Sequence, residues 1–315
     1  MLMLGMILRR VCGGVLTLLI VSLVVFIGTN VLPGDATEAI LGQSASPEAV
    51  AGLRHALGLD LPAHARYLHW LFGLVSGDPG VSLVNRLPVA QLIGPRLANS
   101  LLLTALTAAL AVPLALLIGI TTAIWRGSLY DRVANLAAVS LVAVPEFLLA
   151  TVGVILFAVQ LHWVSAMAKP SVGSLGEALQ SFTLPVLTLS FAITAQMARM
   201  TRAALLGVLD SSYIEMARLK GVRPARLVLR HALRNAAGPI ANAVALNLSS
   251  LLGGVIIVEV IFSYPGLAKL AVDAVETRDM PLVQACAMIF CTTFMLLVLA
   301  ADICSILSNP RLRTG

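Results

Sequence analysis

Six long apolar runs constrain this chain more than any other feature of its sequence. A helix needs about 20 apolar residues to cross the hydrocarbon core of a bilayer. Only 11% of the 315 residues are charged, whereas a soluble domain carries roughly a quarter. We therefore predict an all-α polytopic membrane protein. Its six transmembrane helices are expected at residues 11–29, 101–124, 133–161, 182–197, 240–262 and 283–307.

The first apolar run follows Arg9 and Arg10, as the apolar core of a secretory signal peptide would. The run is longer than the roughly 7–15 residues of such a core, and no clean A-x-A cleavage site follows it. We therefore expect a retained transmembrane helix.

Lys and Arg residues are distributed unevenly between alternate loops. With six spans, 14 of the 21 fall on the side that holds both termini. Basic residues concentrate in cytoplasmic loops, so both termini are predicted to be cytoplasmic. The net charge of +6 then reflects membrane topology. A nucleic-acid partner is not expected, because the basic residues lie beside the spans and form no separate basic domain.

The segment between the first two spans, residues 31–100, carries helix signals of its own. Residues 46–58 combine an N-cap serine, a proline at the first helical position and a C-terminal glycine. In 60–77 apolar residues recur at helical spacing. We expect short helices on the outer surface of the bundle. A further amphipathic helix is predicted in 263–281, with an apolar face toward the membrane surface made of Leu267, Leu270, Ala271 and Ala274.

A charged stretch, residues 213–240, interrupts the apolar sequence between the fourth and fifth runs. Ser212 followed by Glu215 matches a capping box, so a helix is expected to begin at Ser212. It should end at Lys220, with Gly221 as a left-handed stop. Pro224 suits the first turn of a second helix. Two short helices at an angle are therefore predicted.

Two interpretations of this stretch compete. A basic loop bound to anionic lipid headgroups explains the Arg residues, at about 1 kcal/mol each. It does not explain a capped helix, a glycine stop and a restarted helix. We therefore favour a docking element for another protein, with Ala217 and Gly221 allowing close approach to the backbone.

The same stretch resembles the EAA coupling motif of bacterial ABC importer permeases, most strongly that of the dipeptide/oligopeptide/nickel importer family. Segments 258–284 and 309–313 resemble further signatures of that family, so the resemblance covers nearly the whole chain. The sequence departs from the usual pattern at Arg234, Ala268 and Asn309, and also at Glu146, where a small polar residue is more usual. The residues that match the coupling motif are Glu215, Met216, Ala217, Lys220, Gly221, His231 and Leu233.

The resemblance implies a permease subunit of an ATP-driven importer in the bacterial inner membrane, forming half of the pathway for short peptides. The implied partners are a second related permease, two ABC ATPase subunits and an extracytoplasmic substrate-binding protein, within the lipid bilayer. The ATPase would hold the helix around 212–221. Nickel, glutathione or opines remain alternative cargoes. No enzymatic activity and no cofactor are implied.

In this interpretation the chain has four parts. Residues 1–30 form the cytoplasmic N-terminus and first span, and 31–100 the extracytoplasmic helical segment. Residues 101–307 form a five-helix permease core that includes the coupling element 206–237. Residues 308–315 form a cytoplasmic tail.

The three lysines show whether this chain could bind ATP itself. A phosphate-binding Walker A loop needs Gly-Lys-Ser/Thr, but Lys169, Lys220 and Lys269 are followed by Pro, Gly and Leu. ATP would therefore be bound by another polypeptide. The alternative is a secondary transporter driven by an ion gradient, which often shows related halves with broken helices. No such internal symmetry is found.

Three polar residues within the apolar runs are candidates for the translocation pathway. Ionisable groups in a bilayer are costly and usually face a bundle interior or water. Glu146 follows Pro145 in mid-span, and we expect it to meet the ammonium group of a substrate. Asn247 and Glu259 are further candidates, although hydration near the interface or bonding to neighbouring helices explains Glu259 equally well. The spacing of the five histidines does not favour a metal site.

Overall fold

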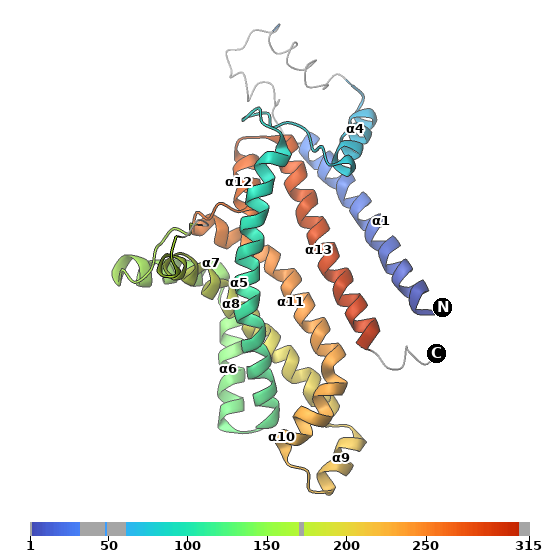
Figure 1. The fold of residues 1–315 in the computed structure, drawn as a ribbon, viewed down its shortest axis with the longest axis vertical. Helices are drawn as coiled ribbons and strands as arrows, with labels where there is room; N and C mark the ends of the chain where they lie inside the picture. The colour runs from blue at the N-terminus through green and yellow to red at the C-terminus, as the bar shows by residue number, and fades with distance from the viewer. Residues whose placement is uncertain (1, 32–47, 49–60, 170–172, 309–315) are drawn as a thin grey trace. The chain divides into compact units, whose positions relative to one another are not determined.

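The structure is a computed structural model that describes residues 2–31, 48, 61–169 and 173–308. Most of this described part is helical, which confirms the all-α class (Figure 1). The chain divides into two compact units. The first comprises Met1–Val11, Leu101–Tyr264 and Phe294–Gly315, and the second comprises Cys12–Ser100 and Pro265–Thr293.

Five helices within the described residues contain stretches long and apolar enough to cross a membrane. Each coincides with one predicted run, and most extend well beyond it. The helix α5, for example, begins at Val89 and not at residue 101. Its 36 residues extend about 54 Å, whereas the hydrocarbon core is about 30 Å thick. The five are α1 (Leu2–Val31), α5 (Val89–Ile124), α8 (Leu175–Leu209), α11 (Leu233–Ile261) and α13 (Met280–Ser308).

The third predicted span, residues 133–161, is broken in the structure. The helix α6 (Leu129–Ala143) meets α7 (Glu146–Gly153) and its π-helical continuation η1 (Val154–Gln160) at an angle of 94° (Figure 1). Pro145 causes the break, because proline lacks an amide hydrogen and forces the preceding residue out of the helical conformation. Only if this bent pair is counted as one span does the described chain have six.

In the second unit, the helix predicted over 60–77 is present as α4 (Ala63–Ser76), which ends at Gly77 with φ +86°. It lies beside α1, where the Tyr67 and Ser22 hydroxyl oxygens are 2.8 Å apart. The rings of Tyr67 and Phe26 meet edge to face at 5.4 Å. The predicted helix over 46–58, apart from residue 48, and the tail from 309 onward lie outside the described residues.

The predicted amphipathic helix between the last two spans is α12 (Leu267–Glu276), but its apolar face was assigned to the wrong environment. Leu267, Leu270 and Ala274 are buried against α5 and α13 and do not face a membrane surface. Two hydrogen bonds to the α5 residues Asn99 and Ser100 hold the start of the helix in place. Asn99 Nδ2 donates to the Pro265 carbonyl oxygen at 2.8 Å, and the Leu267 amide donates to Ser100 Oγ at 2.7 Å.

The first unit is built around α8 and α11, which pack along each other. One apolar cluster lies between them toward the start of α8 and the end of α11. A second cluster lies at the opposite end and supports the short helix α9 (Ser212–Leu219). It includes Leu205 of α8, Ile214 of α9, Val228 and Ala236. The core therefore gives α9 a fixed position on the unit.

Candidate coupling site and translocation pathway

The helix α9 begins within one residue of its predicted start, but its predicted cap is wrong. Ser211 is the N-cap residue, and Ser212 is the first helical residue. The side chain of Ser211 makes no capping bond, since its Oγ donates back to the Val208 carbonyl oxygen at 2.5 Å. Ser212 and Glu215 therefore do not form a capping box. The Glu215 side chain lies exposed on the helix surface instead.

The end of α9 agrees with the predicted glycine stop. Gly221 has φ +78°, in the left-handed region that favours glycine. Its amide donates to the Arg218 carbonyl oxygen at 2.9 Å, and the Val222 amide donates to that of Ala217 at 3.3 Å. These bonds satisfy carbonyl groups that the helix leaves free at its end. Lys220 occupies the C-cap position.

The second helix is not a separate short element. The residues Pro224–Arg226 form α10, and Leu227–Ala232 form the π-helix η2, which continues directly into α11. The restart after Gly221 is therefore the first part of a membrane helix (Figure 1). A π-helical turn inside a longer helix often marks a functional region.

The outward face of α9 carries three apolar side chains that sequence reasoning missed. Tyr213, Met216 and Leu219 are 46%, 56% and 77% exposed. They recur every three residues, so they form one stripe along the helix. Ile214 and Ala217 pack inward against the second apolar cluster. The surface available to another protein is therefore this stripe, with Glu215 and Lys220 exposed beside it, and not Ala217.

The remaining residues of the predicted coupling set lie behind α9. His231 is in η2 and Leu233 begins α11, and both are half-buried. Asn235 joins the two helices, because its Nδ2 donates to the Tyr213 hydroxyl at 2.6 Å. The spacing of 22 residues between Tyr213 and Asn235 gives no local pattern from which this bond could have been predicted.

The structure brings two of the three pathway candidates to one face of α11. A Cβ atom placed on Gly254 would lie 2.5 Å from Glu146 Oε2, so Glu146 lies directly against this glycine. Asn247 lies seven residues earlier on the same face, about 10 Å along the axis. Its Nδ2 donates to the Ala243 carbonyl oxygen at 2.8 Å. Glu259 is fully buried and lies about 120° around the helix from Asn247.

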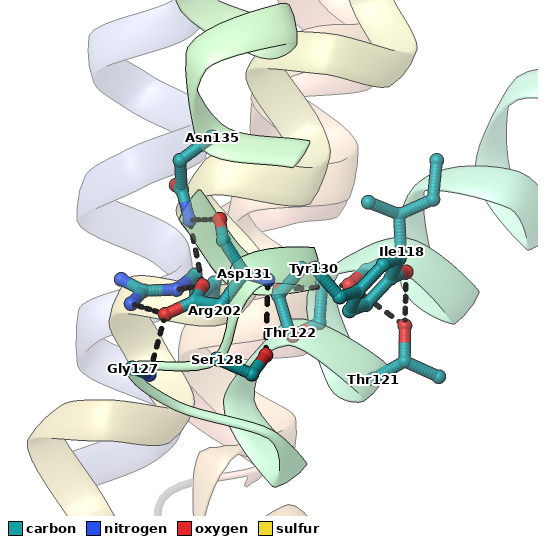
Figure 2. Close-up of polar contacts among 10 residues, drawn as sticks. Ile118, Thr121, Thr122, Gly127, Ser128, Tyr130, Asp131, Asn135 and Arg202 are labelled. Carbon is teal, nitrogen blue, oxygen red and sulfur yellow. Dashed lines mark hydrogen bonds and ion pairs between the residues drawn. The ribbon is translucent and has the colours of Figure 1, made fainter. Parts of the chain in front are cut away.

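The first unit also contains an ion pair that was not predicted from the sequence (Figure 2). Arg202 of α8 donates from Nε and Nη2 to the two carboxylate oxygens of Asp131, in the first turn of α6, at 2.7 and 2.8 Å. Ser128 is the N-cap of α6 and accepts from the Asp131 amide at 3.2 Å. The Ser-x-x-Asp spacing signals the helix start, but nothing local signals the partner 71 residues away.

Comparison with known proteins agrees with this architecture. Residues 115–314 match the family described as binding-protein-dependent transport system inner membrane component. Residues 3–103 match the N-terminal part of a binding-protein-dependent transport system membrane component. The glutathione transport system permease proteins of Salmonella typhi and Escherichia coli are each 39% identical over 311 residues, covering 99% of this chain and 99% of theirs. The chain therefore belongs to the family of binding-protein-dependent transport system inner membrane components.

Membership of this family defines the class of protein. The chain is an ABC importer permease, a multi-pass inner membrane component that works with an ATPase and a substrate-binding protein. It is a transport subunit and not a catalytic enzyme. The ion-gradient secondary transporter considered from the sequence is set aside accordingly.

Proposed function

We propose that this permease forms half of the translocation pathway of an importer for short peptides and is coupled to its ATPase through α9. The exposed stripe of Tyr213, Met216 and Leu219 carries the proposal. This face is too apolar to be left in water without reason. It is also unsuited to hydrocarbon, because Glu215 and Lys220 are exposed beside it. A protein partner is the environment that suits both.

The placement of α9 supports a mechanical role. Its inward residue Ile214 is fully buried, and Asn235 of α11 bonds to Tyr213. A push on α9 therefore acts on both α8 and α11. In the proposed assembly two such permeases, related or identical, face two ATPase subunits at the cytoplasmic side. The substrate-binding protein approaches 31–100 and 263–281 from outside.

A substitution in the exposed stripe tests the docking role. Leu219→Glu places a charge where the partner surface is expected to be apolar, so we expect uptake into proteoliposomes to fall about tenfold or more. The ATPase subunits should also be lost on purification in detergent. Glu215→Ala and Gly221→Arg should uncouple ATP hydrolysis from uptake, with normal membrane insertion. Uptake and ATP hydrolysis are measured together in each variant.

Leu129→Glu is the matched control, because Leu129 is 78% exposed and lies outside α9. It should leave ATPase binding and uptake unchanged. If Leu219→Glu retains both ATPase binding and uptake, α9 is not the docking helix.

The cargo is proposed to be short peptides, with glutathione as a specific candidate within this class. The relatives that share 39% identity are named as glutathione transport permeases, and glutathione is itself a tripeptide with a free ammonium group. The carboxylate of Glu146 is a suitable partner for such a group. Competition of labelled glutathione uptake by unlabelled dipeptides and tripeptides distinguishes a general peptide importer from a dedicated glutathione importer.

A further inference from the structure

The turn between α5 and α6 is tied to α8 by a carboxylate whose hydrogen-bonding capacity is filled (Figure 2). Asp131 Oδ1 accepts from Arg202 Nε and from Asn135 Nδ2, both at 2.7 Å. Asp131 Oδ2 accepts from Arg202 Nη2 at 2.8 Å and from the Gly127 amide at 2.9 Å. The Asp131 side chain is 5% exposed and that of Arg202 is 23% exposed. Separating the pair would leave a buried charge without its partner, which is strongly unfavourable.

A second ion pair joins the turn between α5 and α6 to the C-terminal end of α8. Arg126 Nη1 donates to Asp210 Oδ1 at 2.9 Å. Asp210 is the C-cap of α8 and is followed by Ser211, the N-cap of α9. Both side chains are more than half exposed, so this pair contributes less than the buried one. It nevertheless brings the turn next to the residue from which α9 departs.

The helix α5 also approaches α8 closely at Gly119, where α5 contributes no side chain to the contact. A Cβ atom on Gly119 would lie 2.7 Å from both the Ala198 carbonyl oxygen and Thr201 Cβ. This contact lies within one helical turn of Arg202 along α8. Small residues allow such close approach of membrane helices. The α5–α6 hairpin is therefore held to α8 by backbone packing as well as by charge.

The opposite end of α6 leads to the pathway candidate Glu146. The helix α6 is 15 residues long, about 22 Å. It ends at the break before Pro145, and Glu146 then begins α7 against Gly254. The helix α6 therefore connects the Asp131–Arg202 pair to the break and to the start of α7.

We propose that Asp131 and Arg202 are positioning residues that make the α5–α6 hairpin and α8 move as one body. A displacement of α9 by the ATPase is then carried through α8 and along α6 to the break that holds Glu146. The proposal rests on the proposed docking role of α9. The buried pair acts through the helices it joins and does not contact substrate.

The first test compares matched removals of charge in the reconstituted importer. Asp131→Asn keeps the shape of the side chain but weakens its bonds to Arg202. We expect the number of substrate molecules transported per ATP hydrolysed to fall about tenfold, with the ATPase still bound. Asp302→Asn is the control, because Asp302 also pairs with an arginine, Arg10 Nη1 at 2.7 Å. It should change the ratio less than about twofold.

The ratio separates positioning from stability. A purely structural role lowers the amount of folded complex without changing transport per ATP. The double variant Asp131→Arg with Arg202→Asp should recover part of the ratio lost in either single variant. If folded Asp131→Asn transports normally per ATP, the proposed positioning role of Asp131 and Arg202 is overturned, while docking at α9 stands. If the wild-type ATPase does not bind through α9, the proposed function fails first.

The second test does not require a folded variant of Asp131 or Arg202. Spin labels are attached at Leu136→Cys on α6 and Ala203→Cys on α8, both exposed positions, after the four native cysteines are replaced by alanine. The distance between the labels is measured in the resting and ATP-trapped importer. A single body predicts an unchanged distance. A change larger than one helical turn, about 5.4 Å, would show that α6 and α8 move separately and would overturn the proposal.

Discussion

At the scale of single residues, close packing and left-handed turns explain motif residues that a family pattern only identifies. Asp279, in the Arg-Asp-x-Pro segment, is buried and accepts from the Leu83 amide at 3.1 Å and from Ser82 Oγ. It therefore joins the turn before α13 to the loop before α5. Arg278 adopts φ +57°, which aligns the chain for this bond at some conformational cost. One acidic residue thus organises two segments of the second unit.

Glu146 gives a prediction at the same scale. Its carboxylate lies against Gly254 of α11. Gly254 is seven residues after Asn247 in the same helix. A charge at this depth attracts a cationic group more strongly than a neutral amide does. We expect Glu146→Gln to lower uptake of peptides with a free amino group about tenfold and to affect N-acetylated peptides much less. Uptake kinetics in proteoliposomes provide the measurement.

Asn247→Ala is a useful comparison for Glu146→Gln, because it removes a polar group from the same face without changing the charge. If Glu146→Gln takes up free peptides as fast as the wild type does, and acetylated peptides likewise, the proposed contact with the ammonium group is excluded.

At the scale of elements, the decisive features are the joints between helices. Gly221 separates α9 from the α10–η2–α11 run, and Pro145 separates α6 from α7. Each joint follows from local chemistry, since glycine accepts positive φ and proline cannot continue a hydrogen-bond ladder. The direction taken after each joint follows from packing. The apolar cluster under Ile214 and the contact at Gly254 set those directions.

The contact between α5 and α8 gives the prediction for this scale. Gly119→Ala places a methyl group against backbone and Thr201, so the helices must separate. Such overpacking costs about 1–3 kcal/mol, and we expect a lower melting temperature of the purified permease. Gly94→Ala on the same helix meets nothing within 4 Å. It should leave the melting temperature unchanged or raise it, because alanine favours the helix. Equal shifts in the two variants would contradict the close approach.

At the scale of the whole molecule, the uneven distribution of basic residues predicts the orientation of the chain. Asn85, in the loop before α5, is expected outside, and Lys220, at the end of α9, is expected in the cytoplasm; both are exposed. In a variant without native cysteines, a membrane-impermeant thiol reagent added to spheroplasts should label Asn85→Cys. Lys220→Cys should react only after the membrane is permeabilised. Labelling in the reverse order would invert the proposed topology.

The sequence by itself determined the membrane class, the approximate positions of five of the six predicted membrane helices, α4 and the glycine stop after α9. These features depend on residues that are close in the chain, through apolar content, helical spacing and local backbone preference. The coupling motif was likewise recognisable from residues 215–233, although their contacts were not.

Only the tertiary structure decided the 94° direction change at Pro145, the buried face of α12, the outward stripe of α9 and the Asp131–Arg202 pair. Each depends on which distant segment lies opposite. An amphipathic pattern shows that a helix has an apolar face but does not show whether lipid or protein covers it, since both are apolar. The partner of a buried charge is likewise chosen by packing between helices and has no signature within either one.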